Sequence, residues 1–247
     1  MVHLVGAGPG PADLLTIRAH RLLGAADVVV HDRLVSDEVL ALARPGSERV
    51  FVGKARANHC MPQEEINALL VRLAQAGKRV VRLKGGDPLV FGRGGEEAAA
   101  LAAAGIAHEI VPGVTAALAC AAGAGIPLTH RAVARTVTFV TGHTRDGVLD
   151  LDFAALAAVG GTLAVYMGVA TLPELTAGLI AAGLPCTRPA ALVERGGGAA
   201  QRVLTGTVGS LAALAPGWAG GGPVLALIGD TVSERAARVD ASELAAA

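Results

Sequence analysis

The first half of the chain alternates short apolar runs with longer stretches in which apolar residues recur at every third or fourth position. The short runs are typical of buried strands and the longer stretches of helices. Strict alternation of the two predicts a mainly parallel sheet. The predicted strands are Val2–Val5, Asp27–Val30, Glu48–Val52, Arg79–Leu83 and His108–Val111, and the predicted helices are Leu14–Ala25, Pro62–Gln75, Glu96–Ala104 and an Ala-rich helix that follows Thr115 and ends at Ala124.

The second half shows the same two patterns, but its last strands follow one another with little helix between them. This spacing favours hairpin pairing and a mixed sheet. We therefore predict two α/β domains, residues 1–113 and 114–240, with the active site in the cleft between them and a flexible tail at 241–247. The predicted strands are Thr136–Thr141, Thr162–Met167, Ala190–Val193, Gln201–Thr207 and Val224–Ile228, and the helices are Phe153–Ala158, Leu172–Ala182 and Val208–Leu214.

Glycines crowd the loop Lys84–Gly95, which joins the strand Arg79–Leu83 to the next helix. Gly85 and Gly86 bring no side chains, so the backbone there can approach a ligand, and Pro88 keeps the preceding Asp87 out of helical space. The alternative is a turn in which Asp87 serves only as a cap. The length of the loop and its glycine density favour a ligand loop.

A second glycine-rich turn, Gly6–Pro11, follows the first strand. It departs from the dinucleotide-binding pattern G-x-G-x-x-G, because Pro11 stands where the third glycine is needed. Asp32 and Lys54 also lie just beyond strand ends. In open α/β sheets ligands gather at that edge, so we expect both side chains to share it with Asp87.

Composition narrows the possible functions. The 247 residues carry a net charge of +0 at a pI near 7.1, and only 2% are aromatic, so neither a polyanion-binding surface nor a base-stacking platform is expected. The most apolar window, Val111–Leu128, is broken by Pro112 and Pro127 and predicts core rather than a membrane span. No secretory signal is evident, so we expect a cytoplasmic protein. The widely spaced cysteines indicate neither a disulfide framework nor a metal site: Cys60, Cys120 and Cys186.

A series of motifs runs through nearly the whole chain: Gly6-Ala7-Gly8-Pro9-Gly10, His31-Asp32-Arg33-Leu34-Val35, Gly53-Lys54, Pro62–Asn67, Lys84–Gly95, Pro112-Gly113-Val114-Thr115-Ala116, Gly125–Arg131, Thr141-Gly142-His143, Tyr166-Met167-Gly168 and Val193-Glu194. In this order they resemble the tetrapyrrole methylase family. The resemblance implies a two-domain α/β fold, a homodimer, and S-adenosyl-L-methionine bound in the cleft, with no metal.

The resemblance also implies roles for individual residues. Asp32 matches the family's proton acceptor and Lys54 its proton donor. Structural roles are an alternative for several of the cofactor positions, because Pro9 could shape a turn, Thr115 could cap a helix, and Val90 and Met167 could fill core. The positions that match the family's cofactor contacts are Pro9, Gly85, Gly86, Asp87, Val90, Thr115, Ala116, Met167 and Gly196.

Within the family the motifs look most like those of the members that methylate uroporphyrinogen III at C2 and C7, through precorrin-1 to precorrin-2, for cobalamin and siroheme biosynthesis. That substrate is a polyacid. Lys54 could therefore anchor a carboxylate instead of donating a proton, and basic loop residues could pair with the others. Most of these residues could equally be solvated surface: Arg33, Arg56, His59, Arg93, His130, Arg131 and His143.

The sequence departs from the family pattern at two places. His31 stands where relatives usually have Tyr, and the basic residue that often follows the lysine appears one position later, as Arg56. Three other functions stay open. The first is a sister methyltransferase that acts on a later precorrin. The second is a carrier that binds tetrapyrrole without turnover. The third is a nicotinamide oxidoreductase, against which Pro11 speaks.

Overall fold

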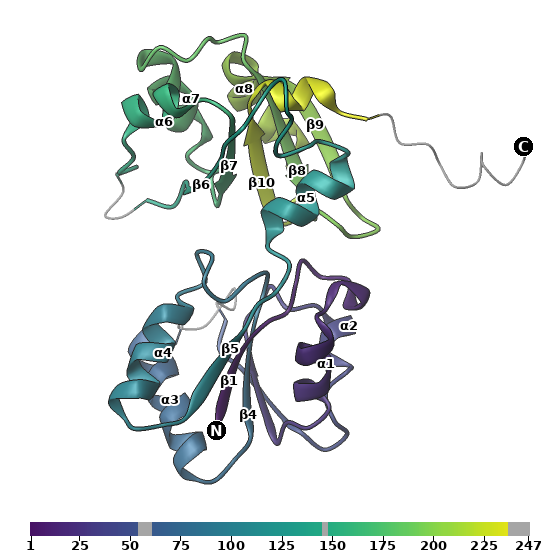
Figure 1. Cartoon of the computed structure of the whole chain (residues 1–247), viewed down its shortest axis with the longest axis vertical. Coiled ribbons are helices and arrows are strands. Elements are labelled where there is room, and N and C mark those ends of the chain that lie inside the picture. Colours follow the sequence, from purple (N-terminus) through teal and green to yellow (C-terminus); the bar gives the residue numbers. More distant parts are fainter. Residues whose placement is uncertain (54–60, 145–147, 237–247) are drawn as a thin grey trace, which may run out of the picture. The chain divides into compact units, whose positions relative to one another are not determined.

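The computed structural model describes residues 1–53, 61–144 and 148–236 (Figure 1). Contacts within the chain divide it into two compact units, Met1–Ala116 and Ala117–Ala247. The sequence placed this division after residue 113. The predicted tail, 241–247, lies outside the described residues.

The first unit is built on a five-stranded sheet with the order β3-β2-β4-β1-β5. All of its strand pairings are parallel, as the alternation of strands and helices predicted. The chain leaves β1 towards β2 and β3, returns to β4, and crosses to β5 on the other side of β1. The order therefore reverses around β1, and the loops after β4, β1 and β5 are neighbours at the carboxyl edge. The strands are β1 Val2–Gly6, β2 Val28–His31, β3 Glu48–Phe51, β4 Val80–Lys84 and β5 His108–Val111.

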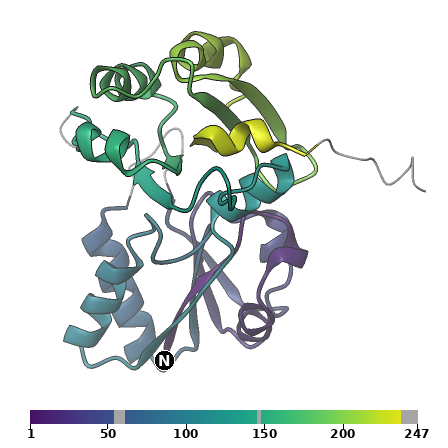
Figure 2. The ribbon, with the colours of Figure 1, turned by 45° about the horizontal axis from the view of Figure 1, so that its top comes forward.

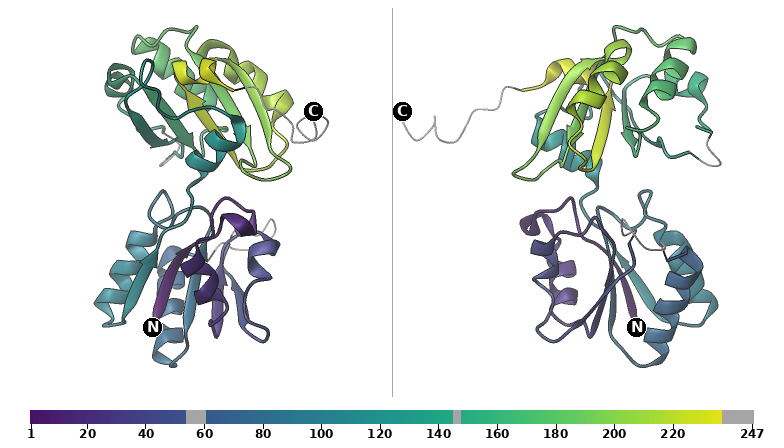
Figure 3. Two further views of the ribbon diagram at one scale, coloured as in Figure 1. Left: turned by 45° about the vertical axis from the view of Figure 1, so that its right-hand side comes forward. Right: turned by 180° about the vertical axis from the view of Figure 1, so that it is seen from behind.

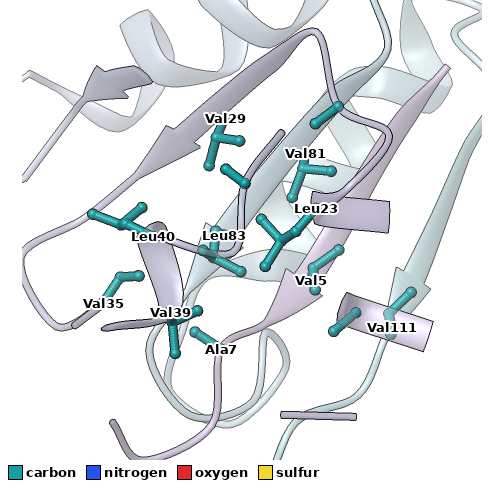
Figure 4. Packing of buried hydrophobic residues seen from close by; sticks show 13 residues of the cluster. Val5, Ala7, Leu23, Val29, Val35, Val39, Leu40, Val81, Leu83 and Val111 are labelled. Atoms are coloured by element: carbon teal, nitrogen blue, oxygen red, sulfur yellow. The ribbon is translucent and has the colours of Figure 1, made fainter. Parts of the chain in front are cut away.

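Helices cover both faces of this sheet (Figure 1). On one face lie α1 (Ile17–Leu23) and α2 (Asp37–Leu40), and on the other lie α3 (Gln63–Gln75) and α4 (Gly94–Ala103). Because both faces are covered, β2 and most of β1 are apolar, whereas the edge strand β3 carries the exposed Glu48 and Arg49. Figure 4 shows the core under α1 and α2: Val5, Ala7, Leu23, Val29, Val35, Val39, Leu40, Val81, Leu83 and Val111.

The second unit holds a mixed sheet with the order β6-β7-β10-β8-β9. β6 and β7 are parallel, and the remaining pairs are antiparallel, which confirms the predicted mixed sheet. α6, α7 and α8 lie on one face, and α5 with the 3-10 turn η2 on the other (Figures 2 and 3). The elements are α5 Ala116–Ala124, β6 Val137–Thr141, α6 Phe153–Val159, β7 Thr162–Tyr166, α7 Leu172–Ala181, β8 Pro189–Glu194, β9 Arg202–Thr207, α8 Val208–Trp218, β10 Val224–Ile228 and η2 Asp230–Glu234.

Two predicted helices differ from the structure by three or more residues at one end. The helix predicted from Leu14 begins at Ile17, because the Thr16 hydroxyl accepts a hydrogen bond from the Ala19 amide and caps the helix there. The residues before it form a 3-10 turn, η1 (Ala12–Leu14). α8 continues to Trp218, past the predicted end at Leu214. Among the described residues no helix is both long and apolar enough to cross a membrane.

Asp27 ties three segments together at the amino edge of the first sheet. Its carboxylate accepts hydrogen bonds from the backbone and guanidinium of Arg79, at 2.9 to 3.2 Å, and from Arg44 at 2.9 Å. The bonds from Arg79, with the charge of both arginines, hold the pKa of Asp27 well below its usual range. The interactions of Asp27 with Arg44 and Arg79 therefore stabilise the fold only while the Asp27 carboxylate is ionised.

Asp27→Asn is expected to lower the thermal midpoint at neutral pH and to flatten its pH dependence in acid. Because the folded-state pKa lies below that of an unfolded aspartate, about 3.9, the contribution is complete above that pH and is lost as the pH falls through the folded-state value. Circular dichroism melts between neutral and acidic pH measure it. Asp13→Asn, at an exposed position, serves as the control. Parallel pH curves for Asp27→Asn and the parent chain would contradict the assignment.

Candidate functional site

The loops after β1 and β4 are joined backbone to backbone. The Gly8 amide donates to the Gly86 carbonyl at 3.2 Å, and the Gly86 amide donates to the Gly8 carbonyl at 2.7 Å. The Ala7 amide also donates to the Lys84 carbonyl at 2.7 Å. The two loops thus form an antiparallel bridge beyond the end of the parallel sheet, which fixes Gly8 and the adjoining Pro9 against Gly86.

The loop after β5 packs into the same place, at a contact between Gly6, Gly86 and Gly113 that we call the glycine junction. A Cβ on Gly6 would lie 2.5 Å from the Gly113 nitrogen and 2.7 Å from the Gly86 oxygen. A Cβ on Gly113 would lie 2.3 Å from the same oxygen. All of these neighbours are backbone atoms, which have no rotamer to change. Any side chain at Gly6 or Gly113 would therefore push the loops apart.

One side of the glycine junction is open. Gly86 has a left-handed backbone, with φ +69°, and a Cβ there would lie 3.8 Å from the Ala116 nitrogen and 3.9 Å from the Thr115 Cα. Pro9 follows Gly8 on the neighbouring loop. The structure therefore brings four of the predicted cofactor positions close together around the partly exposed backbone of Gly86: Pro9, Gly86, Thr115 and Ala116. Such a surface suits a ligand that is bound through main-chain groups.

Gly85 and Asp87 shape the loop after β4 from within. A Cβ on Gly85 would lie 2.6 Å from the Leu34 Cβ, so this glycine lets the loop pack on the segment after β2. The Asp87 carboxylate accepts from the Leu89 amide at 2.8 Å and from the Gly113 amide at 3.1 Å. The turn role that the sequence left open for Asp87 is present, and the same side chain also clasps the loops after β4 and β5. The Val90 amide closes the turn on the Asp87 carbonyl at 3.4 Å.

Asp32 follows β2 at the same carboxyl edge. Its Oδ1 accepts from the Leu34 amide at 3.0 Å, and its Oδ2 lies 3.7 Å from Nη2 of Arg82. About a quarter of the side chain, 26%, is exposed. The carboxylate is thus held on one oxygen and remains accessible to a substrate. Three other predicted site residues lie outside the described residues: Lys54, Arg56 and His59.

Charged side chains that the sequence did not assign lie buried beside Asp32. Arg82, Lys84 and Glu97 are 3%, 4% and 0% exposed. Burial lowers the pKa of Lys84, the charge of Arg82 lowers it further, and Glu97 opposes both.

Within the residues that the structure describes, no group of acidic, His and Cys side chains could hold a metal ion.

The predicted substrate-binding residues are divided between the two units. Arg33 and Arg93 are exposed on the first unit, and His130, Arg131 and His143 are exposed on the second. Arg93 pairs with Glu96 through two hydrogen bonds of 2.8 and 2.7 Å, which raise the pKa of Arg93 and lower that of Glu96. A substrate carboxylate at Arg93 would have to displace Glu96.

Two predicted cofactor positions, Met167 and Gly196, follow β7 and β8 of the second unit. A Cβ on Gly196 would lie 2.2 Å from Sγ of Cys120, so Gly196 allows its loop to pack on α5. Burial there raises the pKa of the Cys120 thiol to about 12. The Tyr166 hydroxyl accepts from the Ala117 amide at 3.1 Å, near the start of α5. Both loops are therefore anchored on the same helix.

Several residues other than glycine adopt the left-handed backbone conformation in the loops after β4, β7 and β8. In the described part of the chain the non-glycine residues with φ between 51° and 58° are Phe91, Arg93, Met167 and Arg195. Each follows β4, β7 or β8. Phe91 and Arg195 adjoin the predicted cofactor positions Val90 and Gly196, Met167 is one itself, and Arg93 is a predicted substrate-binding residue. This conformation costs a non-glycine residue about 1–2 kcal/mol, and such strain is concentrated at functional sites. The sequence carries no signal for it.

Substitutions at Met167 can distinguish the effect of its backbone strain from that of its side-chain contacts. Half of the residue, 50%, is exposed, so its side chain contributes little to the core. Met167→Gly and Met167→Ala remove the same contact, but only glycine relieves the backbone. We expect the Gly variant to be about 1 kcal/mol more stable than the Ala variant in urea. Both should bind S-adenosylhomocysteine about 10- to 100-fold more weakly, as for the loss of a Met side chain from a binding surface. Parental affinity in both variants would show that Met167 makes no contact.

Comparisons with known proteins identify the family. A family model described as Tetrapyrrole (Corrin/Porphyrin) Methylases matches residues 1–212. The siroheme synthase of Gluconacetobacter diazotrophicus is 57% identical over 235 residues, and that of Pseudomonas aeruginosa is 54% identical over 234. Each match covers 95% of this chain and 50% of the relative. The chain therefore spans about half the length of these curated relatives.

Solved structures match nearly end to end. A uroporphyrin-III C-methyl transferase from Thermus thermophilus, in complex with S-adenyl homocysteine, is 43% identical with a TM-score of 0.81, and the match covers 94% of this chain and 99% of that one. A cobalt precorrin-4 methyltransferase is 29% identical with a TM-score of 0.83, over 94% and 95% of the two chains. The family model matches well over half of the chain, and the parallel and mixed sheets agree with these structures, so the chain belongs to the tetrapyrrole methylase family.

Proposed function

We propose that the chain is an S-adenosyl-L-methionine-dependent C-methyltransferase that methylates uroporphyrinogen III at C2 and C7. The reaction runs through precorrin-1 to precorrin-2 and releases S-adenosyl-L-homocysteine. The observation that carries the proposal is the glycine junction, whose open side gathers Pro9, Gly86, Thr115 and Ala116. The similarity to a uroporphyrin-III C-methyl transferase with S-adenyl homocysteine bound supports both the donor and the acceptor.

The chain's own residues fit this donor. Gly86 brings no side chain, and a Cβ at its position would meet only backbone atoms of Thr115 and Ala116, at 3.9 and 3.8 Å. Asp87 holds the loops that carry these residues. Gly85 acts by letting its loop pack on Leu34. Val90, Met167 and Gly196 complete the proposed set of contacts. When bound, S-adenosyl-L-methionine supplies an activated methyl group on a sulfonium.

Positioning is the larger part of the expected catalysis. Alignment of two bound reactants removes roughly 7–11 kcal/mol of a barrier, whereas one general base contributes about 10²–10⁴-fold, or roughly 3–5 kcal/mol. Methylation of a ring carbon leaves positive charge on the macrocycle, which is relieved when a proton is lost. Asp32 is the partly exposed carboxylate at this edge of the sheet and accepts that proton. Lys54 stays a predicted proton donor or carboxylate anchor.

Basic loop residues would bind the substrate's carboxylates. Arg33 lies directly after Asp32, and Arg93 lies at the start of α4. A guanidinium suits this task because it can donate two parallel hydrogen bonds to one carboxylate. Arg56, His59, His130, Arg131 and His143 complete the proposed set.

Incubation of the purified chain with uroporphyrinogen III and radiolabelled methyl donor tests the function. We expect a labelled product that carries two added methyl groups, shown by mass spectrometry, and two molecules of S-adenosyl-L-homocysteine for each molecule of that product. Transfer only to a later precorrin would identify a sister methyltransferase, which the similarity to a cobalt precorrin-4 methyltransferase makes the second candidate. Tight binding of uroporphyrinogen III without transfer would identify a carrier.

The similarity to siroheme synthases supports a role of the product in siroheme biosynthesis. A role in cobalamin biosynthesis, the homodimer and the cytoplasmic location stay predictions from the sequence.

A further inference from the structure

Buried charges interrupt the apolar core at the carboxyl end of β4. Val80 faces the core under α3 and α4, and Arg82 and Lys84 follow it on the same face of the strand. Arg82 pairs in the sheet with Leu4 of β1 and Val30 of β2. Glu97 of α4 meets both cations, and we call Arg82, Lys84 and Glu97 the β4 charge cluster.

One oxygen of Glu97 organises this cluster. Oε1 accepts from Nζ of Lys84 at 2.9 Å, from Nε of Arg82 at 3.0 Å and from Nε2 of Gln63 at 3.3 Å. Gln63 is itself held by the Asn67 side chain at 3.0 Å. Oε2 of Glu97 is buried and has no hydrogen-bond partner among the residues described. The carboxylate is thus directed towards the two cations of β4.

Arg82 links Glu97 to Asp32. Its Nε donates to Glu97, its Nη1 donates to the Leu83 carbonyl at 3.1 Å, and its Nη2 lies 3.7 Å from Oδ2 of Asp32. A guanidinium is planar, so an anchor at Nε also fixes the direction of Nη2. Oδ1 of Asp32 is held separately by the Leu34 amide. Arg82 therefore lies between Glu97 and the second carboxylate oxygen of Asp32.

Stability does not account for the β4 charge cluster. Ions removed from water carry a large desolvation penalty, and well-packed apolar residues in place of a complete buried ion pair are often neutral or stabilising. The rest of this face of the sheet is apolar, with Leu4, Val30 and Val80 as neighbours. Asp32 is the member of this network that is open to solvent, at 26%, and the one to which the proposed function assigns chemistry.

We propose that Glu97 is a positioning residue: through Arg82 it holds the Asp32 carboxylate in the orientation in which it accepts the substrate proton. The inference rests on the proposed function. It predicts that Glu97 affects turnover only while Asp32 is present.

A double-mutant cycle on turnover tests this dependence. Glu97→Gln is nearly isosteric but removes the charge that holds Arg82, so kcat should fall roughly 5- to 100-fold, as for other positioning partners. The affinity for S-adenosylhomocysteine, measured by calorimetry, should not change. In an Asp32→Asn background Glu97→Gln should cause little further loss. Losses that multiply in full would overturn the inference, because a merely structural role acts whether or not Asp32 is intact.

A second variant decides the question if Glu97→Gln fails to fold. Arg82→Lys keeps the charge, but its single ammonium cannot span Glu97 and Asp32 as the planar guanidinium does. Its loss of kcat should also vanish in the Asp32→Asn background, and a full loss there would contradict the link. Glu109→Gln is the matched control, because Glu109 pairs with His3 at 2.7 Å on another strand and should leave kcat unchanged.

The parent chain separates the two proposals. If it transfers no methyl group to a tetrapyrrole, the proposed function fails and this inference fails with it. If it transfers methyl groups while the Glu97 and Asp32 losses multiply, only the inference fails.

Discussion

Gly113→Ala is expected to abolish measurable binding of S-adenosylhomocysteine and to destabilise the chain. The added methyl group would lie 2.3 Å from the Gly86 carbonyl oxygen and 2.8 Å from the Gly6 Cα, so the loops after β1, β4 and β5 have to separate. Overpacking of this kind costs about 1–3 kcal/mol, and we expect the upper end because every neighbour is backbone. Urea unfolding measures the stability, and calorimetry measures the binding.

Gly95→Ala controls for the loss of glycine itself. Gly95 lies in the first turn of α4, and nothing lies within 4 Å of the position that its Cβ would take. Alanine favours a helix over glycine, so this variant should gain about 0.5–1 kcal/mol and bind as the parent does. Parental affinity in Gly113→Ala would show that the glycine junction does not form the donor site.

Asp32→Asn is expected to lower kcat about 10²–10⁴-fold while the affinity for S-adenosylhomocysteine stays the same. The amide oxygen of Asn can still accept from the Leu34 amide, so the loop keeps its shape. The amide cannot accept the substrate proton as a carboxylate does. Single-turnover measurements with uroporphyrinogen III separate the chemical step from product release.

The control for Asp32 is Asp37→Asn. Asp37 is an exposed acid in the first turn of α2, and its loss should leave turnover unchanged. An Asp32→Asn chain that turns over as fast as the parent would remove Asp32 from the mechanism, and with it the role inferred for Glu97.

Apolar runs bounded by polar residues predicted the strands well, because the central strands of both sheets are buried on two faces. The predicted bounds of β5 and β10 agree with the structure. α2 was not predicted, because Asp37–Leu40 is a single turn and too short to show helical spacing. Ser36, which caps it with its hydroxyl, was the available signal.

The sequence also predicted a ligand loop at these turns, but not why each glycine is there. Gly85 and Gly86 were expected to act alike, whereas one packs on Leu34 and the other opens beside Thr115. Glu97 was missed as well. An acidic residue in the first turn of a helix is expected from the helix dipole alone. The local sequence therefore does not show that Glu97 is buried against two cations of β4.

The position of β1 governs the order in which the first unit can form. β1 pairs only with β4 and β5 within the described chain, and both are made long after it. Among the strands of this sheet β1 comes first in the chain and waits longest for a neighbour, and contacts this distant in sequence slow folding. A nascent chain that ends before residue 113 contains Gly6 and Gly86 but not Gly113, the third glycine of the junction. The glycine junction is thus completed only when β5 and its following turn are in place.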